Sequence, residues 1–208
     1  MWLFLRDLPL SADARILHLA PEKGLYEALS RKVAPGNIHA TDIDPRRYAH
    51  IPGIQRLDLC DLDQFPSDSY DLIVHSHVLE HVPCTIAYPL YHLHRALKPD
   101  GWHICVIPFM PGRYDETFDD IGDAERTRRF GQFDHVRRFG RDDIPRHLGA
   151  VLDLSRHVDA LDVFAPEDLQ EANIPLSSGR GFSIDTVLRL RKFDMRFLGD
   201  RAPAPVPA

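Results

Sequence analysis

Two carboxylates stand where a nucleotide-type ligand would need hydrogen-bond acceptors, downstream of a turn that contains a glycine. The apolar run 15–19 leads into a turn around Pro21 and Gly24 and then into a segment of helical character. This order predicts strand, turn and helix, which directs the unpaired N–H groups at the start of the helix toward the carboxyl end of the strand. Such a turn suits a polar or anionic ligand. Asp42 and Asp44 end the next strand about twenty residues later, where an acid accepts hydrogen bonds from ribose hydroxyls.

Further chemistry-bearing residues follow the next strand-like runs. Asp58 follows the run 54–57, and the run 70–74 leads into His75 and Ser76. Alternation of strands and helices predicts a parallel sheet, whose carboxyl ends lie at one edge. We therefore expect four strand ends to line one crevice.

In this region the chain resembles class I S-adenosylmethionine-dependent methyltransferases of the small-molecule type, and in particular methyltransferase type 11. The resemblance covers residues 15–108. The matching motifs, in family order, are Asp42-Ile43-Asp44-Pro45 for the ribose, Asp58-Leu59 for the adenine, segments 69–74 and 78–82 for the fourth strand and the helix after it, and 97–102 for the turn before the fifth strand. Each motif is short, and their order and spacing make the resemblance specific.

The resemblance implies S-adenosylmethionine as the cofactor. Its site would be formed by the first turn and the strand ends that follow. The residues expected to contact it are His18, Ala20, Pro21, Glu22, Gly24, Asp42, Ile43, Asp58, Leu59, His75 and Ser76. Asp61 and Asp63, in a polar loop beside the expected adenine, are alternatives to Asp58.

The first turn departs from the family pattern, which runs acid-x-Gly-x-Gly-x-Gly. His18 stands at the acid, Ala20 at the first glycine and Glu22 at the second, and only Gly24 remains. Glu22 is the candidate to supply the missing carboxylate. The alternative is an ordinary turn without a ligand, and the downstream acids favour binding.

Methyl transfer from a sulfonium is an in-line displacement, so an enzyme must mainly align donor and acceptor and exclude water. In the resembled fold, residues 113–147 would form a cap over the substrate. His135 is the candidate catalytic residue, because a neutral imidazole accepts a proton near pH 7; Tyr114 is second, with Glu116 as a rival. The alternative for His135 is an exposed loop histidine.

Two other patterns lead to weaker hypotheses. His75, His77 and His81, with Glu80, have a spacing that resembles metal ligands, but strand and helix would separate them, so we expect no metal. Segment 126–146 has seven arginines against three acids. These arginines either recognise an anionic acceptor or form a solvated surface, with Arg128, Arg129, Arg137 and Arg138 pointing outward.

Composition limits the class of protein. The chain has 208 residues, with 25 Lys plus Arg against 31 Asp plus Glu and a net charge of −6. This balance argues against a general nucleic-acid binder and favours a small-molecule partner. Without a signal-like or membrane-spanning segment, we expect no membrane partner and a cytoplasmic location. The three cysteines lack metal-ligand spacing and are expected to be reduced thiols.

The expected architecture is one α/β domain over residues 1–200. A doubly wound, mostly parallel seven-stranded sheet carries the cap 113–147 after the fifth strand. We expect the sixth strand at 150–154 and the last at 183–191, paired antiparallel at the end of the sheet. A helix over 85–97 would expose His92 and His94, and the proline-rich tail 201–208 is expected to be disordered.

Two rival functions remain open. A nicotinamide-dependent oxidoreductase shares the strand, turn, helix and acid, but the bulky residues at 20–23 oppose close approach of a pyrophosphate. A methyltransferase-like protein without turnover is conceivable because the first turn is altered, and the retained acids argue against it.

Overall fold

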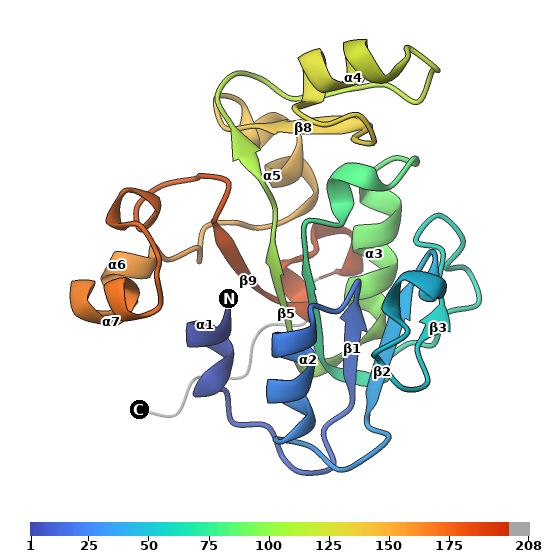
Figure 1. Cartoon of the computed structure of the whole chain (residues 1–208), viewed down its shortest axis with the longest axis vertical. Coiled ribbons are helices and arrows are strands. Elements are labelled where there is room, and N and C mark those ends of the chain that lie inside the picture. The colour runs from blue at the N-terminus through green and yellow to red at the C-terminus, as the bar shows by residue number, and fades with distance from the viewer. Residues whose placement is uncertain (200–208) are drawn as a thin grey trace.

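A computed structural model describes residues 1–199, so the expectation for the tail 201–208 lies outside the described residues. Its centre is a six-stranded sheet in the order β3-β2-β1-β4-β5-β9 (Figure 1). The strands are β1 (Ile16–Leu19), β2 (Ile38–Asp42), β3 (Gln55–Arg56), β4 (Tyr70–Ser76), β5 (Leu97–Val106) and β9 (Val187–Arg191). All neighbours pair in parallel except β9, which runs antiparallel to β5. The expected α/β fold with a mostly parallel sheet is confirmed.

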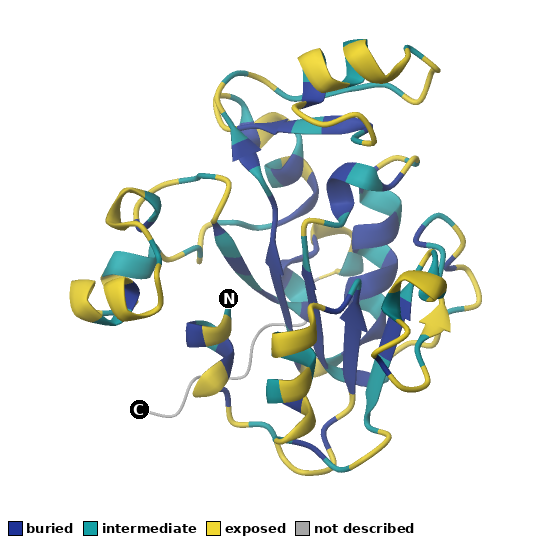
Figure 2. Cartoon of the chain, in the orientation of Figure 1, coloured by how far each residue is buried: buried dark blue, intermediate teal, exposed yellow. Residues whose placement is uncertain are grey.

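Helices cover both faces of this sheet, which explains why β1 is fully buried and β4 is buried at most of its residues (Figure 2). Ile16, Leu72 and Ile104 pack on the face of α1 (Trp2–Arg6) and α2 (Lys23–Ser30). The alternate strand residues, such as Leu17 and Ile73, pack on the opposite face together with α3 (Ala87–Ala96). This alternation follows from the two-residue period of a strand.

The strand count differs from the expectation, because the described residues contribute six strands to this sheet. Segment 150–154, expected to be the sixth strand, instead begins with the last two residues of α5 (Leu148–Val151). Leu152 then makes a single antiparallel bridge, to Met195. Leu148, Val151 and Leu152 are all buried, at the three- and four-residue spacing of a helix. The last strand is shorter than 183–191 but pairs antiparallel as expected.

Segment 113–147 forms most of a second, small layer beyond the carboxyl end of β5 (Figure 1). It contains β7 (Asp115–Glu116), α4 (Asp123–Phe130) and β8 (Arg137–Gly140), and β8 lies between β7 and β6 (Phe109–Met110). Gly140 allows this packing, since a Cβ there would lie 2.1 Å from the Arg113 carbonyl carbon.

The remaining elements are short. They are α6 (Ala160–Val163), α7 (Pro166–Glu171) and the 3-10 turns η1 (Pro45–Tyr48), η2 (Leu79–His81), η3 (Ile144–Arg146), η4 (Leu176–Ser178), η5 (Lys192–Asp194) and η6 (Arg196–Leu198). Phe164, after α6, packs edge-to-face on Phe4 of α1 with 4.8 Å between the ring centroids. Among residues 1–199, no helix combines the length and the apolar character needed to cross a membrane.

Three polar residues are buried where the sequence indicated exposure. His92 and His94 are 9% and 0% exposed, because the face of α3 that carries them is covered rather than open to solvent. Arg137, expected to point outward with its neighbours, is also 0% exposed. The expectation for these side chains was wrong, because partners distant in the sequence cover them.

Candidate active site

The carboxyl ends of the parallel strands meet at one edge of the sheet. Backbone hydrogen bonds join them: the Ala20 N–H donates to the Thr41 oxygen at 2.8 Å and the Leu57 N–H donates to the Asp42 oxygen at 3.0 Å. On the other side of β1, His77 follows β4 and donates its N–H to the Val106 oxygen at 3.2 Å. Asp42 and Asp58 therefore lie at the same edge, as expected for one crevice.

In the first turn, Ala20 adopts a backbone conformation that is usually found at glycine. Ala20, at the position of the family's first glycine, has a φ of +46°, a region that side chains other than glycine rarely adopt. Pro21 is buried, and Gly24 lies within α2. The sequence change therefore leaves the sharp turn in place and stores local strain there.

Glu22 lies between the ends of β1 and β4. Its Oε2 is 3.5 Å from Nε2 of His18, whose ring is fully buried in β1. Burial opposes ionisation of Glu22, but hydrogen bonding and charge from His18, together with the Ser76 hydroxyl, hold the pKa of Glu22 below its usual value. The carboxylate of Glu22 thus lies beside His18, the residue that stands at the acid position of the family motif.

The end of β2 holds two carboxylates, Asp42 and Asp44, and one exposed apolar side chain, Ile43. Asp42 accepts the Asp44 N–H at 2.7 Å, and Asp44 itself pairs with Arg46 at 2.6 Å. Tyr48, which the sequence analysis did not single out, lies beside Asp42: burial, and then the charge of Asp42 and a hydrogen bond to it, raise the pKa of Tyr48 to about 12. Ile43 is 51% exposed, which leaves an apolar surface at the crevice.

The loop after β3 contains Asp58 and its two rivals. Asp58 accepts the Cys60 N–H at 2.9 Å and lies 3.4 Å from Arg56, while Leu59 is buried beneath it. Asp63 accepts the Tyr88 hydroxyl at 2.8 Å, and Asp61 is exposed in the same loop. Asp58 is thus the carboxylate fixed closest to the strand end.

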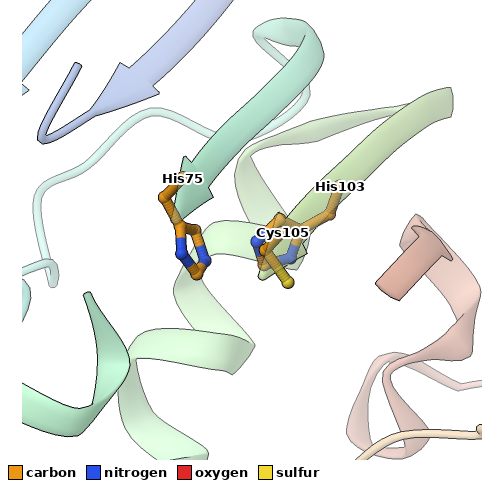
Figure 3. A group of neighbouring side chains, drawn as sticks. All are labelled: His75, His103 and Cys105. Atoms are coloured by element: carbon orange, nitrogen blue, oxygen red, sulfur yellow. The ribbon is translucent and has the colours of Figure 1, made fainter. Parts of the chain in front are cut away.

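His75 is placed differently from Ser76, although both end β4. Figure 3 shows its ring directed toward His103 and Cys105 of β5, and all three residues are 0% exposed. His103 Nδ1 is 3.1 Å from His94 Nε2, and His94 Nδ1 is 3.2 Å from the Lys192 oxygen. Burial lowers the pKa of His75 to about 4. His75 therefore belongs to a neutral histidine cluster in the core, whereas Ser76 faces a cavity.

That cavity has a volume of about 270 Å³ and lies between α1, the ends of β4, β5 and β9, and the segment 157–181. Ser76 and His77 form its wall at the crevice, and Leu3, Phe4 and Val106 contribute apolar surface. Asp159 and Asp185 are the acidic residues of its lining, and no lysine or arginine lines it. His77, a titratable base of this lining, has a pKa raised by the hydrogen bond to Glu80.

A second polar group joins η2 to segment 113–147. His81 and His135 pack edge-to-face with 4.7 Å between ring centroids, and Val136 donates its N–H to the Glu80 oxygen at 2.9 Å. Glu80 pairs with His77 Nδ1 at 3.2 Å. His135 thus lies beside η2, the turn that follows β4, and is not an isolated loop histidine. The sequence analysis noted the spacing of His75, His77 and His81 with Glu80 and named His135 separately; the fold brings Glu80, His81 and His135 together.

Tyr114 belongs to a separate network. Its hydroxyl donates to Glu116 Oε2 at 2.7 Å, and burial followed by this hydrogen bond raises the pKa of Tyr114. Glu116 also accepts Arg137 Nε at 2.8 Å, and the Arg137 guanidinium donates further to the Leu79 and Cys84 oxygens. This network fastens segment 113–147 to η2.

The arginines of this segment are also engaged within it. Arg129 makes a forked pair with Asp115 at 3.0 and 2.6 Å, and Arg126 donates to two backbone oxygens. Arg128 pairs with Glu125. No arginine of this segment lines the cavity.

Comparison with known proteins identifies the family. The family model described as a methyltransferase domain matches residues 3–149. Among curated proteins, none matches this sequence.

Similar solved structures include the YcgJ protein from Bacillus subtilis, with TM-score 0.54, 19% identity and coverage of 85% of this chain and 78% of that one. A putative methyltransferase from Haloferax volcanii, solved in complex with the Trm112 methyltransferase activator, has TM-score 0.51 and 18% identity over 89% and 83% of the two chains. A putative methyltransferase from Bacillus halodurans has TM-score 0.50 and 16% identity over 82% and 80%. At these identities the similarity shows the fold, and the family match shows the activity. The chain belongs to the methyltransferase domain family and is a class I S-adenosylmethionine-dependent methyltransferase.

Proposed function

We propose that this enzyme transfers the methyl group of S-adenosylmethionine to a small, uncharged acceptor bound in the cavity beside Ser76 and His77. The observation that carries the proposal is the position of this cavity: it opens at the strand end that also holds Glu22, next to the crevice of Asp42 and Asp58. Donor and acceptor sites would then share one wall, as an in-line displacement requires.

The donor site would be held by carboxylates at successive strand ends. Asp42, supported by Tyr48, would accept the ribose hydroxyls. Asp58 would accept the adenine amino group, and the exposed side chain of Ile43 would pack on the ring. Glu22, whose lowered pKa keeps it ionised near neutral pH, would bind the cationic amino group of the methionine part.

The cavity lining supports an uncharged acceptor over the anionic one that the arginine-rich segment suggested. The lining offers the carboxylates of Asp159 and Asp185 and no lysine or arginine side chain. An anion would lose its hydration there beside two carboxylates and without a lysine or arginine to pair with, which is unfavourable. Arg126, Arg128 and Arg129 already bind acids or carbonyl oxygens, so they would not compensate for the lost hydration of an anion.

We propose segment 113–147 as a cap that approaches the active site from η2, with His135 as its reactive group. It contributes no lining residue to the cavity, and the contact of Glu80 with His77 links the two regions. His135 Nδ1 lies 3.1 Å from the Phe130 oxygen and donates to it, which leaves the lone pair of Nε2 available. Burial lowers the pKa of His135, so the ring is neutral at pH 7. A neutral imidazole in this position can accept a proton or bind a cation. Tyr114, engaged by Glu116, would act as a support for the cap.

Calorimetry with S-adenosylmethionine tests the donor site. Asp42→Ala should weaken binding by about 1–3 kcal/mol, the cost of a lost charged hydrogen bond. Asp44→Ala is the matched control, because Asp44 is engaged by Arg46 and should change the affinity little. Equal losses in the two variants, or tighter binding of a nicotinamide dinucleotide by the native protein, would refute the donor site.

The acceptor is tested with a pool of metabolites, each scored for a mass increase of one methylene by mass spectrometry. We expect the acceptors that gain a methyl group to be uncharged before transfer. A set of products confined to carboxylates and phosphates would contradict the assignment of the cavity.

A further inference from the structure

We propose that Glu80, His81 and His135 bind one divalent transition-metal ion where η2 meets segment 113–147. The ligand atoms of the three residues lie within 4.8 Å of one another. Two ligands that share an ion at about 2.1 Å lie up to about 4 Å apart, so small side-chain rotations would bring all three to one ion. The set combines two imidazoles and one carboxylate, which suits Zn²⁺, Fe²⁺ or Mn²⁺.

Each imidazole already has a partner for the ring nitrogen that an ion would not use. His81 Nδ1 lies 3.4 Å from the Asp134 carboxylate, and His135 Nδ1 donates to the Phe130 oxygen at 3.1 Å. Both arrangements leave Nε2 free as a ligand. Histidines that bind metals are typically oriented in this way, by a carboxylate or a carbonyl oxygen on the other nitrogen.

Glu80 provides the second, independent observation. Its side chain is 2% exposed; Oε1 pairs with His77, and Oε2 is buried without a hydrogen-bond partner among the described residues. An unpaired carboxylate oxygen in this environment is costly. A metal ion bound between Glu80, His81 and His135 would satisfy it.

The core cluster of His75, His103 and Cys105 is the competing site, since its ligand atoms are also close together (Figure 3). All three residues are fully buried between β4, β5 and α3, so an ion would have no path from solvent without opening the core. The Glu80 site differs, because the His81 side chain is 34% exposed and His135 is only partly buried. An ion can therefore reach it in the folded protein.

Three protein ligands leave further coordination positions on the ion open. A role for this ion in catalysis extends the proposed function and rests on it. A hydroxyl group of the acceptor bound at such a position has a lowered pKa and loses its proton to solvent water. The resulting oxygen attacks the methyl carbon as the S–CH3 bond of the sulfonium breaks, and the neutral thioether S-adenosylhomocysteine leaves. His77, which lines the cavity and pairs with Glu80, connects the two regions. The site would thus favour an acceptor with a hydroxyl group.

Metal binding is measured directly, without cofactor or acceptor, by incubating the purified protein with Mn²⁺ or Zn²⁺, dialysing it and counting metal per chain by mass spectrometry. We expect one ion per chain in the native protein and at least a tenfold weaker affinity in His135→Ala. Glu80→Gln should also lose the ion, with circular dichroism as the check on its folding. His50→Ala is the matched control, because it removes an exposed histidine outside both clusters.

Cys105→Ala separates the two clusters. Retention of the ion in Cys105→Ala and loss in His135→Ala support the proposal; loss in Cys105→Ala, or a sulfur-to-cobalt charge-transfer band after Co²⁺ loading, would place the ion in the core and overturn it. Equal binding by native protein, His135→Ala and His50→Ala would also overturn it, because the ion would then bind elsewhere. A bound ion in a protein that methylates nothing would refute the proposed function and leave the metal site standing.

Discussion

Replacing Arg137 by methionine should destabilise the protein by removing the group that holds segment 113–147 on η2. The guanidinium is 0% exposed and donates to Glu116 at 2.8 Å and to the Leu79 and Cys84 oxygens. Methionine fills much of the volume but leaves these three acceptors without their donor. Loss of one partner of a buried ion pair costs about 3–5 kcal/mol. We expect a loss in the lower half of this range, about 3–4 kcal/mol, because Glu116 is 25% exposed and still accepts the hydrogen bond from the Tyr114 hydroxyl.

The neighbouring arginine is the matched control. Arg138 lies on the same strand, is half-buried and makes one hydrogen bond, to the Arg113 oxygen at 3.3 Å. Arg138→Met should therefore cost less than about 1 kcal/mol, as is usual for solvent-accessible charges. Arg137→Lys keeps the charge but not the fork, so its loss should fall between the two.

Urea denaturation gives the free energy of unfolding, and hydrogen exchange locates the change. The Thr117 and Val136 amides, which donate to the Val136 and Glu80 oxygens, should lose protection in Arg137→Met more than amides in β1 and β4. If Arg137→Met unfolds within 1 kcal/mol of the native protein, or if Arg138→Met costs as much, the fastening role of Arg137 is refuted.

Two further predictions concern strain and pH. Ala20→Gly should stabilise the protein by about 0.5–1 kcal/mol in urea denaturation, because glycine adopts the φ of +46° without strain; a loss of stability would show that the turn is unstrained. Burial lowers the pKa of His94 to about 4, below its value of about 6.5 in the unfolded chain, so the unfolded state binds the proton first as the pH falls. Protonation of His94 in the unfolded chain should lower the free energy of unfolding by about 2 kcal/mol between pH 7.5 and pH 5. The decrease begins near pH 6.5 and ends near pH 4. His94→Gln should reduce this dependence of the free energy of unfolding on pH. An unchanged slope in the variant would assign the pH dependence to other groups.

The sequence by itself determined the order of the elements and the position of the acids. Alternating apolar runs and the residues that end them are local signals, and parallel strands bring their carboxyl ends to one edge whatever the loops do. The edge that holds Asp42 and Asp58 could therefore be predicted from motif order alone. The sequence shows that the first turn departs from the glycine pattern of the family. Only the positive φ of Ala20 shows that the chain still makes the sharp turn.

Tertiary structure decided which polar residues are buried and which distant residues meet. Arg137 follows the same local pattern as Arg138, yet it is buried because Leu79 and Cys84, more than fifty residues earlier, accept its hydrogen bonds. Residues 150–151 end helix α5 and only Leu152 makes a strand-like bridge, because Leu148, Val151 and Leu152 pack inward at helical spacing. Glu80 and His135 likewise belong to elements that no local pattern joins, and their contact exists because segment 113–147 folds back onto η2. Local patterns fix periodicity, whereas burial and partner choice depend on long-range contacts that form only when the chain folds.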